Sequence, residues 1–404
     1  MQHNLKRIRV VFLLFVITTS NVVFSQETFK DEPMEPELYE RLFGLDSLVD
    51  HVLSNRERYR LQFMVTDIIE NDSVFIIGET HDYSVPRWYF YPASVVKLPI
   101  ALMSLEKLKE LNFSTQATLR FDRDFECGNM KFVEESRKSS LSFQKMIREL
   151  IIVSNNDYYN SLYHFLTPKR INNEFFQKGF AKTNIYRDFS GCEMPLNMKT
   201  HGFVLNESSM GKCYMQRESH LELEEFASKY RYNTIKLLGS RKEYRREIVN
   251  GPFDFNYNLE YSLRDIHSTS MRFFFPQFFD REDCWDIREE DRKLLIESMM
   301  SVPKDLKQAK YTDKKKYQDN FYKYLVHGDK NQKYDSVISY SKLGLSYGFV
   351  TETAYIHNPT TNRHYVTTIN LYVNSNDIIN DGKYEYDELA RPFFARLGQL
   401  ILEL

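Results

Sequence analysis

The chain of 404 residues is long enough to bury a large core, because 42% of its residues are hydrophobic and 15% are aromatic. Its formal net charge is −2, and its charged fraction of 27% is ordinary for a folded soluble protein. A nucleic-acid binder needs a basic excess to neutralise phosphates, so these values argue against a nucleic-acid partner. No linker, low-complexity tract or internal repeat divides the sequence, and we expect one compact body with subdomains.

The first 25 residues have the pattern of a signal peptide. Basic residues at positions 6 to 9 precede an apolar stretch over 10–17, and small or polar residues follow up to Ser25. The apolar stretch is too short to cross a bilayer. We therefore predict cleavage after Ser25 and a periplasmic or secreted protein without a stable membrane span. An uncleaved membrane anchor is the alternative.

The segment 35–93 is expected to begin a sheet. Leucine and valine at helical spacing predict a helix within 35–58. Residues 61–69 and 74–82 are rich in β-branched and aromatic side chains and flank a turn, which predicts a hairpin. A strongly apolar helix is then expected over 95–111, with Pro99 near its start.

The rest of the chain predicts helices followed by strands. Residues up to about 330 are mostly helical in pattern, for example over 142–153, 218–239 and 289–300. Strands are predicted at 335–343, 347–358 and 363–373, and a final amphipathic helix from about 387. This order predicts an α+β fold in which 35–93 and 335–404 share one antiparallel sheet flanked by helices, with a helical subdomain over 94–334.

Four cysteines are the only candidates for cross-links. Two disulfides could form among them in any of three connectivities, and the sequence does not choose between these. No CxxC pair occurs, and the ten histidines lack HExxH or HxH spacing, so we expect no metal and no cofactor. The cysteines are Cys127, Cys192, Cys213 and Cys284.

The first reactive motif is the S-x-x-K pair Ser94 and Lys97, which opens an apolar helix. One turn of helix brings the Lys97 amine round to the Ser94 hydroxyl. A serine hydroxyl is a weak nucleophile at neutral pH and needs such a base, together with donors for the developing oxyanion. Taken alone, a tetrapeptide of this kind also occurs by chance.

Three further motifs follow in order: Ser154-Asn155-Asn156, Glu193-Met194-Pro195-Leu196-Asn197, and Lys342-Leu343-Gly344. Each also has an ordinary structural interpretation, as a turn or helix cap, a solvated acidic loop and an edge-strand lysine. Their joint occurrence in this order and setting favours a functional site.

With these motifs, residues 40–404 resemble the class A β-lactamases and penicillin-binding proteins, whose signature is S-x-x-K, S-D-N and K-T-G. The resemblance implies that Ser94 attacks, that Lys97 assists proton transfer and that Ser154 relays a proton to the leaving nitrogen. It also implies that Glu193 activates the water that releases the product.

The resemblance further implies a set of substrate-binding residues. Asn156 would orient the substrate, Asn197 would hold the deacylating water with Glu193, and Lys342 would attract a substrate carboxylate. The third motif, with Gly344, would line the site, and the backbone amides of Ser94 and Leu345 would form the oxyanion hole.

Two features depart from the family pattern. Leu343 and Leu345 stand where the family carries hydroxyl residues that help bind the β-lactam carboxylate. The loss of a hydrogen bond to a charged group commonly costs about 1.5–3 kcal/mol. The long segment between Glu193 and Lys342 also implies an insertion, which we assign to about 205–265.

Three functions remain open. The sequence favours a monomeric serine hydrolase that opens β-lactams through an acyl-enzyme. The second is a carboxypeptidase, esterase or amidase acting on a D-Ala-type peptide or small ester, for which the two leucines are the clue. The third is a binding scaffold of the same fold, although such a scaffold has no need to keep all four reactive residues.

Overall fold

The computed structural model describes residues 34, 39–40, 42–123, 126–138, 141–180, 182–193, 196–220, 236–313, 315–329 and 336–403. The chain divides into two units, 1–32 and 33–404. The first unit lies outside the described residues, and so does the predicted signal peptide. The described residues all belong to the second unit.

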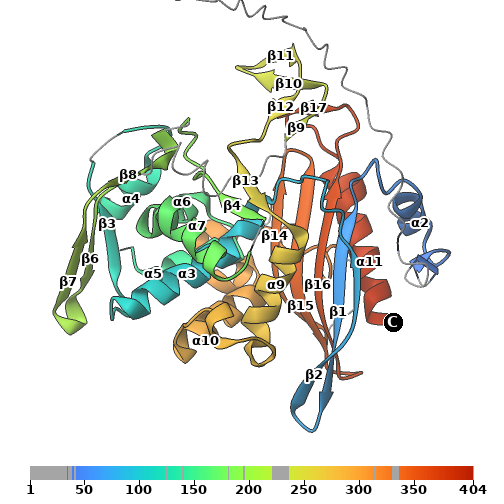
Figure 1. Ribbon diagram of the computed structural model, residues 1–404, viewed down its shortest axis with the longest axis horizontal. Coiled ribbons are helices and arrows are strands. Elements are labelled where there is room, and N and C mark those ends of the chain that lie inside the picture. Colours follow the sequence, from blue (N-terminus) through green and yellow to red (C-terminus); the bar gives the residue numbers. More distant parts are fainter. Residues whose placement is uncertain are drawn as a thin grey trace, which may run out of the picture. The chain divides into compact units, whose positions relative to one another are not determined.

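A five-stranded antiparallel sheet joins the two ends of this unit, as predicted (Figure 1). Its strand order is β14-β15-β16-β1-β2, so the hairpin from the beginning of the unit extends the meander from its end. The strands are β1 (Gln62–Asn71), β2 (Val74–Tyr83), β14 (Ile338–Ser346), β15 (Phe349–Asn358) and β16 (Arg363–Tyr372).

Helices cover both faces of the sheet. On one face, α2 (Ser47–Ser54) and α11 (Arg391–Glu403) bury valine, leucine and phenylalanine side chains in one core cluster with strand residues. The other face contacts α9 (Leu263–Phe274), where Met271 and Phe275 pack on Ile68 and Val366. The predicted final helix is confirmed, although a short π-helical turn over 386–390 precedes it.

The chain between the two parts of the sheet forms a helical region with its own core, which lies beside the sheet on the side of β14 (Figure 1). Of the predicted helices, 95–111, 142–153 and 289–300 are confirmed by α3, α5 and α10. The helices are α3 (Lys97–Glu110), α4 (Lys131–Lys138), α5 (Phe143–Ile152), α6 (Asn156–Leu166), α7 (Pro168–Gln177) and α10 (Glu289–Met300).

The segment that was expected to continue as helix contains short strands instead. The prediction of a helix over 218–239 is wrong at its described ends, which are strands, while 221–235 lie outside the described residues. Strands of two to five residues are too short to give a period in the sequence. These strands are β3 (Thr118–Phe121), β4 (Thr183–Ile185), β5 (Lys199–Thr200), β6 (Phe203–Glu207), β7 (Lys212–Gln216), β8 (Ser219–His220), β9 (Leu237–Leu238), β10 (Arg241–Tyr244), β11 (Glu247–Asn250), β12 (Phe253–Asp254) and β13 (Leu259–Tyr261). A further short strand, β17 (Ile378–Ile379), follows β16 and pairs with β10.

The cysteines form one disulfide, between Cys127 and Cys192. Cys213 is exposed and Cys284 is buried, and both are free thiols. In the part of the chain that the structure describes, no helix is both long and apolar enough to span a membrane.

Candidate active site

Ser94 lies in a short 3-10 turn, Ala93–Val96, that leads directly into α3. The turn is strained, because Ala93 has a left-handed backbone with φ 47°. The serine side chain is half-buried and lines a cleft of about 230 Å³. The rest of the cleft is lined by Tyr91, by the start of α6, by the loop 187–191, by Asn258 and by residues 345–347 at the end of β14.

The strand of the third motif packs against the serine turn. A Cβ added to Gly344 would lie 2.6 Å from the backbone nitrogen of Ser94 and 2.8 Å from the carbonyl oxygen of Pro92. Only glycine permits this close approach. Gly344 therefore brings the end of β14, with Leu345, to the cleft. Leu343 and Leu345 lie two residues apart on the face of the strand that packs on the core cluster of α2 and α11, where Leu343 is buried.

Lys97 is fully buried and points toward the second motif. Its Nζ atom donates to the carbonyl oxygen of Ser154 at 2.5 Å, to Ser154 Oγ at 3.0 Å and to Asn156 Oδ1 at 2.6 Å. Burial, together with the nearby charge of Lys342, lowers the pKa of Lys97 well below its usual value. A lysine that loses its proton this readily can accept one from a neighbouring hydroxyl.

Lys342 approaches the same hydroxyl from β14. Its Nζ atom donates to Ser154 Oγ at 3.1 Å and to the carbonyl oxygen of Leu343 at 2.7 Å. Burial lowers the pKa of Lys342 to about 7, although buried Glu352 on β15 opposes the shift. The Ser154 hydroxyl therefore lies between two buried amines.

The backbone around this hydroxyl is strained in two more places. Ser154, between α5 and α6, has φ 54°, and Tyr347, after β14, has φ 54° as well. Asn155 caps α6 by accepting a hydrogen bond from the amide of Tyr158 at 3.2 Å, which fixes the turn. Side-chain-bearing residues in left-handed conformations cluster at functional sites.

Glu193 and Asn197 do not line the cleft of Ser94. The Glu193 side chain is exposed. Asn197 is buried, and its amide group contacts Asp188 and Cys192 rather than the cleft. The predicted roles of these two residues stay predictions.

Two residues that the motifs did not identify, Arg187 and Asp188, do line the cleft. They lie at the start of the loop that carries Cys192. A single arginine or aspartate between motifs carries no signal in a sequence, because only the path of the loop brings it to the site.

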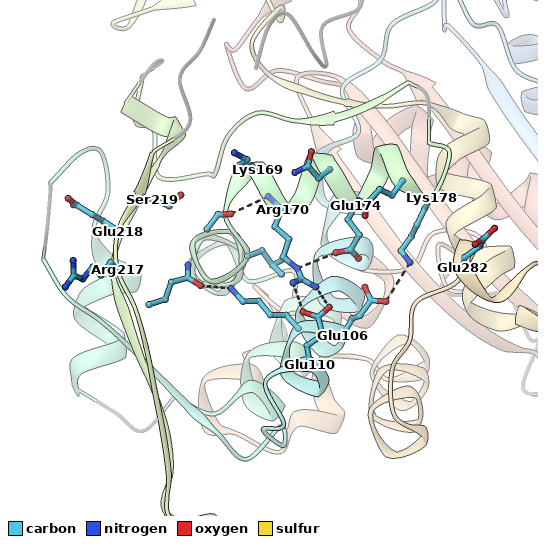
Figure 2. A pocket seen from close by; sticks show the side chains of 16 residues that line it. Glu106, Glu110, Lys169, Arg170, Glu174, Lys178, Arg217, Glu218, Ser219 and Glu282 are labelled. Atoms are coloured by element: carbon cyan, nitrogen blue, oxygen red, sulfur yellow. Dashed lines mark hydrogen bonds and ion pairs between the residues drawn. The ribbon is translucent and has the colours of Figure 1, made fainter. Parts of the chain in front are cut away.

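A larger cavity of about 850 Å³, here named the α7 pocket, lies elsewhere on the helical region (Figure 2). Two of its cationic side chains are paired with carboxylates: Arg170 forms a bidentate pair with Glu110 at 2.6 and 2.7 Å, and Lys178 lies 3.7 Å from Glu106. None of the predicted site residues lines this pocket.

No group of three histidine, cysteine, aspartate or glutamate side chains among the described residues could hold a metal ion. The predicted absence of a metal stays a prediction for the whole chain.

Comparisons with known proteins agree with the motifs. The model of a β-lactamase enzyme family matches residues 47–213, the segment that contains Ser94, Lys97, Ser154 and Glu193. No curated protein matches the sequence.

The solved structures that resemble the chain are distant in sequence. A class A β-lactamase from Mycobacterium abscessus is 12% identical, with a TM-score of 0.50, over 88% of this chain and 98% of that one. A β-lactamase from Burkholderia ambifaria is 11% identical, with a TM-score of 0.49, over 89% and 99%. A mutant of PBP-A, solved as an acyl-enzyme with penicillin G, is 13% identical, with a TM-score of 0.45, over 89% and 98%.

At these identities the structural likeness shows the α+β fold, while the family model supports a serine hydrolase of the β-lactamase or penicillin-binding type. The match over residues 47–213 and the shared fold thus confirm the likeness to class A β-lactamases and penicillin-binding-protein-like serine hydrolases that the motifs predict.

Proposed function

We propose that the protein hydrolyses β-lactams through an acyl-enzyme on Ser94. The observation that carries the proposal is the Ser154 hydroxyl, which lies 3.0 Å from the amine of Lys97 and 3.1 Å from that of Lys342, beside the cleft that Ser94 lines. Two amines with lowered pKa values around one hydroxyl are suited to proton transfer near neutral pH.

In the proposed acylation, the Ser94 oxygen attacks the carbonyl carbon of the cyclic amide. The proton of Ser94 passes to Lys97, and the backbone amides of Ser94 and Leu345 stabilise the oxyanion. When the carbon–nitrogen bond breaks, Ser154 donates a proton to the nitrogen and is reprotonated by one of the two amines. Asn156, which accepts a hydrogen bond from Lys97 and lines the cleft, orients the substrate.

Water then attacks the acyl group, and we propose Glu193, with Asn197, as the group that activates this water. Both residues belong to the loop that follows the cleft residues Arg187 to Gly191.

A second candidate is a penicillin-binding-type carboxypeptidase or esterase that releases its acyl group slowly. Two observations favour it: the Glu193 side chain is exposed outside the cleft, and Leu345 contributes no hydroxyl to the cleft. Its substrate would be a D-Ala-type peptide or a small ester.

The experiment that separates the candidates follows the intact mass of the mature protein over time, after addition of a chromogenic cephalosporin or a penicillin. Turnover that is absent in Ser94→Ala and stalls as an adduct in Glu193→Ala supports the β-lactamase. A long-lived adduct on the unmutated protein supports the second candidate. Glu218→Ala, which removes an exposed carboxylate of the α7 pocket, is the matched control.

A folded protein that shows neither adduct nor turnover contradicts the β-lactamase and the penicillin-binding carboxypeptidase, and leaves an esterase or the binding scaffold. Circular dichroism of each variant establishes that it is folded, so that lost reactivity is assigned to the removed side chain.

We also propose that the protein is exported and monomeric. The family likeness supports export, and mass spectrometry of the protein from the periplasm or medium tests it by locating the first residue of the mature chain. Light scattering on the purified protein tests the monomer.

A further inference from the structure

The cleft of Ser94 has one cationic side chain among the described residues that line it, Arg187. Lys342, which the motif assigns to the substrate carboxylate, is buried and does not line the cleft. Its amine donates instead to Ser154 Oγ and to the carbonyl oxygen of Leu343. The charge that a substrate meets on entering the cleft is therefore that of Arg187.

Most N–H donors of the Arg187 guanidinium are available to a ligand. Its side chain is half-buried, and one of its five N–H groups donates to the carbonyl oxygen of Cys192 at 3.1 Å. No carboxylate among the described residues forms an ion pair with it. The guanidinium is also close enough to Tyr91 and Tyr347, on the other walls of the cleft, to oppose the rise in their pKa values that burial causes.

Among the described residues that line the cleft, Asp188 has the only carboxylate, and it does not neutralise Arg187. Its Oδ1 atom accepts from the amide of Ser190 at 3.0 Å, from Ser190 Oγ at 2.6 Å and from Asn197 Nδ2 at 2.8 Å. Its Oδ2 atom accepts from His164 Nε2 at 3.0 Å. A carboxylate has about four lone-pair sites, so these four hydrogen bonds use all of them. The negative charge of Asp188 is therefore balanced by donors within the loop and α6.

Helix α6 holds the loop in place from one face. The carbonyl oxygens of Tyr186 and Arg187 accept from the hydroxyls of Tyr163 and Tyr159, at 3.1 and 3.2 Å. The amide of Phe189 donates to Asn160 Oδ1 at 2.8 Å, and the Phe189 ring stacks on Tyr159. The backbone is thus fixed at Arg187 and at the residues before and after it in the sequence. This limits the conformational entropy that is lost when the Arg187 side chain binds a ligand.

We propose that Arg187 is the anion receptor of the site, so that the enzyme selects acyl donors that carry a carboxylate held by the loop wall rather than by Lys342. The inference rests on the proposed acylation of Ser94 and names the substrate class of that site. A guanidinium binds a carboxylate through two parallel hydrogen bonds, which also sets the orientation of the ligand. Leu343 and Leu345 in the third motif then cause no loss of affinity for the substrate carboxylate, because Arg187 binds it instead.

The test compares a chromogenic cephalosporin with its methyl ester, which lacks the negative charge. The second-order rate constant of acylation is measured for the unmutated protein, for Arg187→Ala and Arg187→Lys, and for Arg217→Ala, which removes an exposed arginine of the α7 pocket. For the free acid we expect a loss of about 10- to 100-fold in Arg187→Ala, a partial recovery in Arg187→Lys and no change in Arg217→Ala. For the ester, all four proteins should agree within about threefold.

Equal losses on the acid and the ester, or no loss on either, overturn the proposal while leaving acylation of Ser94 intact. Absence of acylation by both compounds contradicts the proposed function instead. A second measurement then still decides on Arg187: isothermal titration with penicilloate, the ring-opened product, needs no acylation. Its affinity should be about 10-fold or more weaker for Arg187→Ala than for the unmutated protein, and equal affinities overturn the proposal.

Discussion

The Ser94 cleft and the α7 pocket differ in how their charges are balanced. The α7 pocket is the larger cavity, about 850 Å³ against 230 Å³, and in it Arg170 and Lys178 face carboxylates (Figure 2). Beside the cleft, two buried lysines share one serine hydroxyl, and Arg187 has no carboxylate partner among the described residues. Two amines around one hydroxyl, rather than the size of the cavity, therefore mark the reactive region.

Removal of one charge from each region should have the largest effect. Lys97→Met should lower acylation of Ser94 by about 10²–10⁴-fold, since it removes the proposed base. Lys178→Met, in the α7 pocket, should leave acylation unchanged. The rates are measured from intact mass over time. Equal rates for Lys97→Met and the unmutated protein would contradict the role of Lys97 as the general base.

The Lys97→Met variant should also change how stability depends on pH. Because the pKa of Lys97 is lowered in the folded protein, the unfolded chain binds more protons, and the free energy of unfolding rises with pH up to the ordinary lysine pKa of about 10.5. Lys97→Met should remove this contribution and flatten the rise. Urea denaturation at pH 7, 8 and 9 measures it.

A steric change tests how closely β14 must approach the serine. Gly344→Ala places a methyl group 2.6 Å from the Ser94 nitrogen and 2.9 Å from that of Val95, and both are backbone atoms that cannot rotate away. We expect acylation to fall about 100-fold and the free energy of unfolding to fall by about 1–3 kcal/mol. Gly179→Ala, at a left-handed glycine with open space around it, should cost stability alone.

Removal of the disulfide tests how the loop with Arg187 is held. The double variant Cys127→Ser and Cys192→Ser frees a link across 65 residues and should lower the free energy of unfolding by about 2–4 kcal/mol. Acylation should fall only a few-fold, because α6 still holds the loop. Cys213→Ser, which replaces an exposed free thiol, is the control, and a double variant as stable as this control would show that the link is dispensable.

The smallest effect is expected from the α7 pocket itself. Burial, and then the neighbouring Glu106, raise the pKa of Glu174 to about 9. Between about pH 4.5 and 9 the folded protein keeps a proton that the unfolded chain releases, so this group lowers stability as pH rises. Glu174→Gln should therefore be about 1 kcal/mol more stable than the unmutated protein at pH 8 and equal at pH 4. Thermal denaturation checks this, and a change in acylation would contradict the comparison.

The sequence predicted the sheet and the helices around Ser94 because these elements are long. Ten-residue strands such as β1 and the 14-residue helix α3 repeat their apolar positions often enough to reveal the period. The strands between 199 and 261 are too short for this, and their pairing depends on residues far away in the chain, as in β13 with β4.

The site was predictable to the extent that its residues lie in motifs. The structure brings Lys97, Ser154, Asn156 and Lys342 together by hydrogen bonds beside Ser94. The loop from 186 to 193 has no motif of its own at Arg187, and its path depends on α6 and on a disulfide that the sequence left among three connectivities. Its contribution to the cleft could not be derived before the fold was known.

The left-handed backbone of Ala93, Ser154 and Tyr347 has a consequence for protein engineering. Each of these residues would be relieved by glycine, by roughly 1 kcal/mol or more. At Tyr347 the loss of a ring that packs on Tyr91, Phe253 and Phe255 outweighs this relief. At Ser154, a selection for heat resistance alone would favour glycine and would remove the hydroxyl on the way. A library of variants should therefore be screened for acylation rate as well as for melting temperature, because a substitution that raises the melting temperature can remove a reactive group.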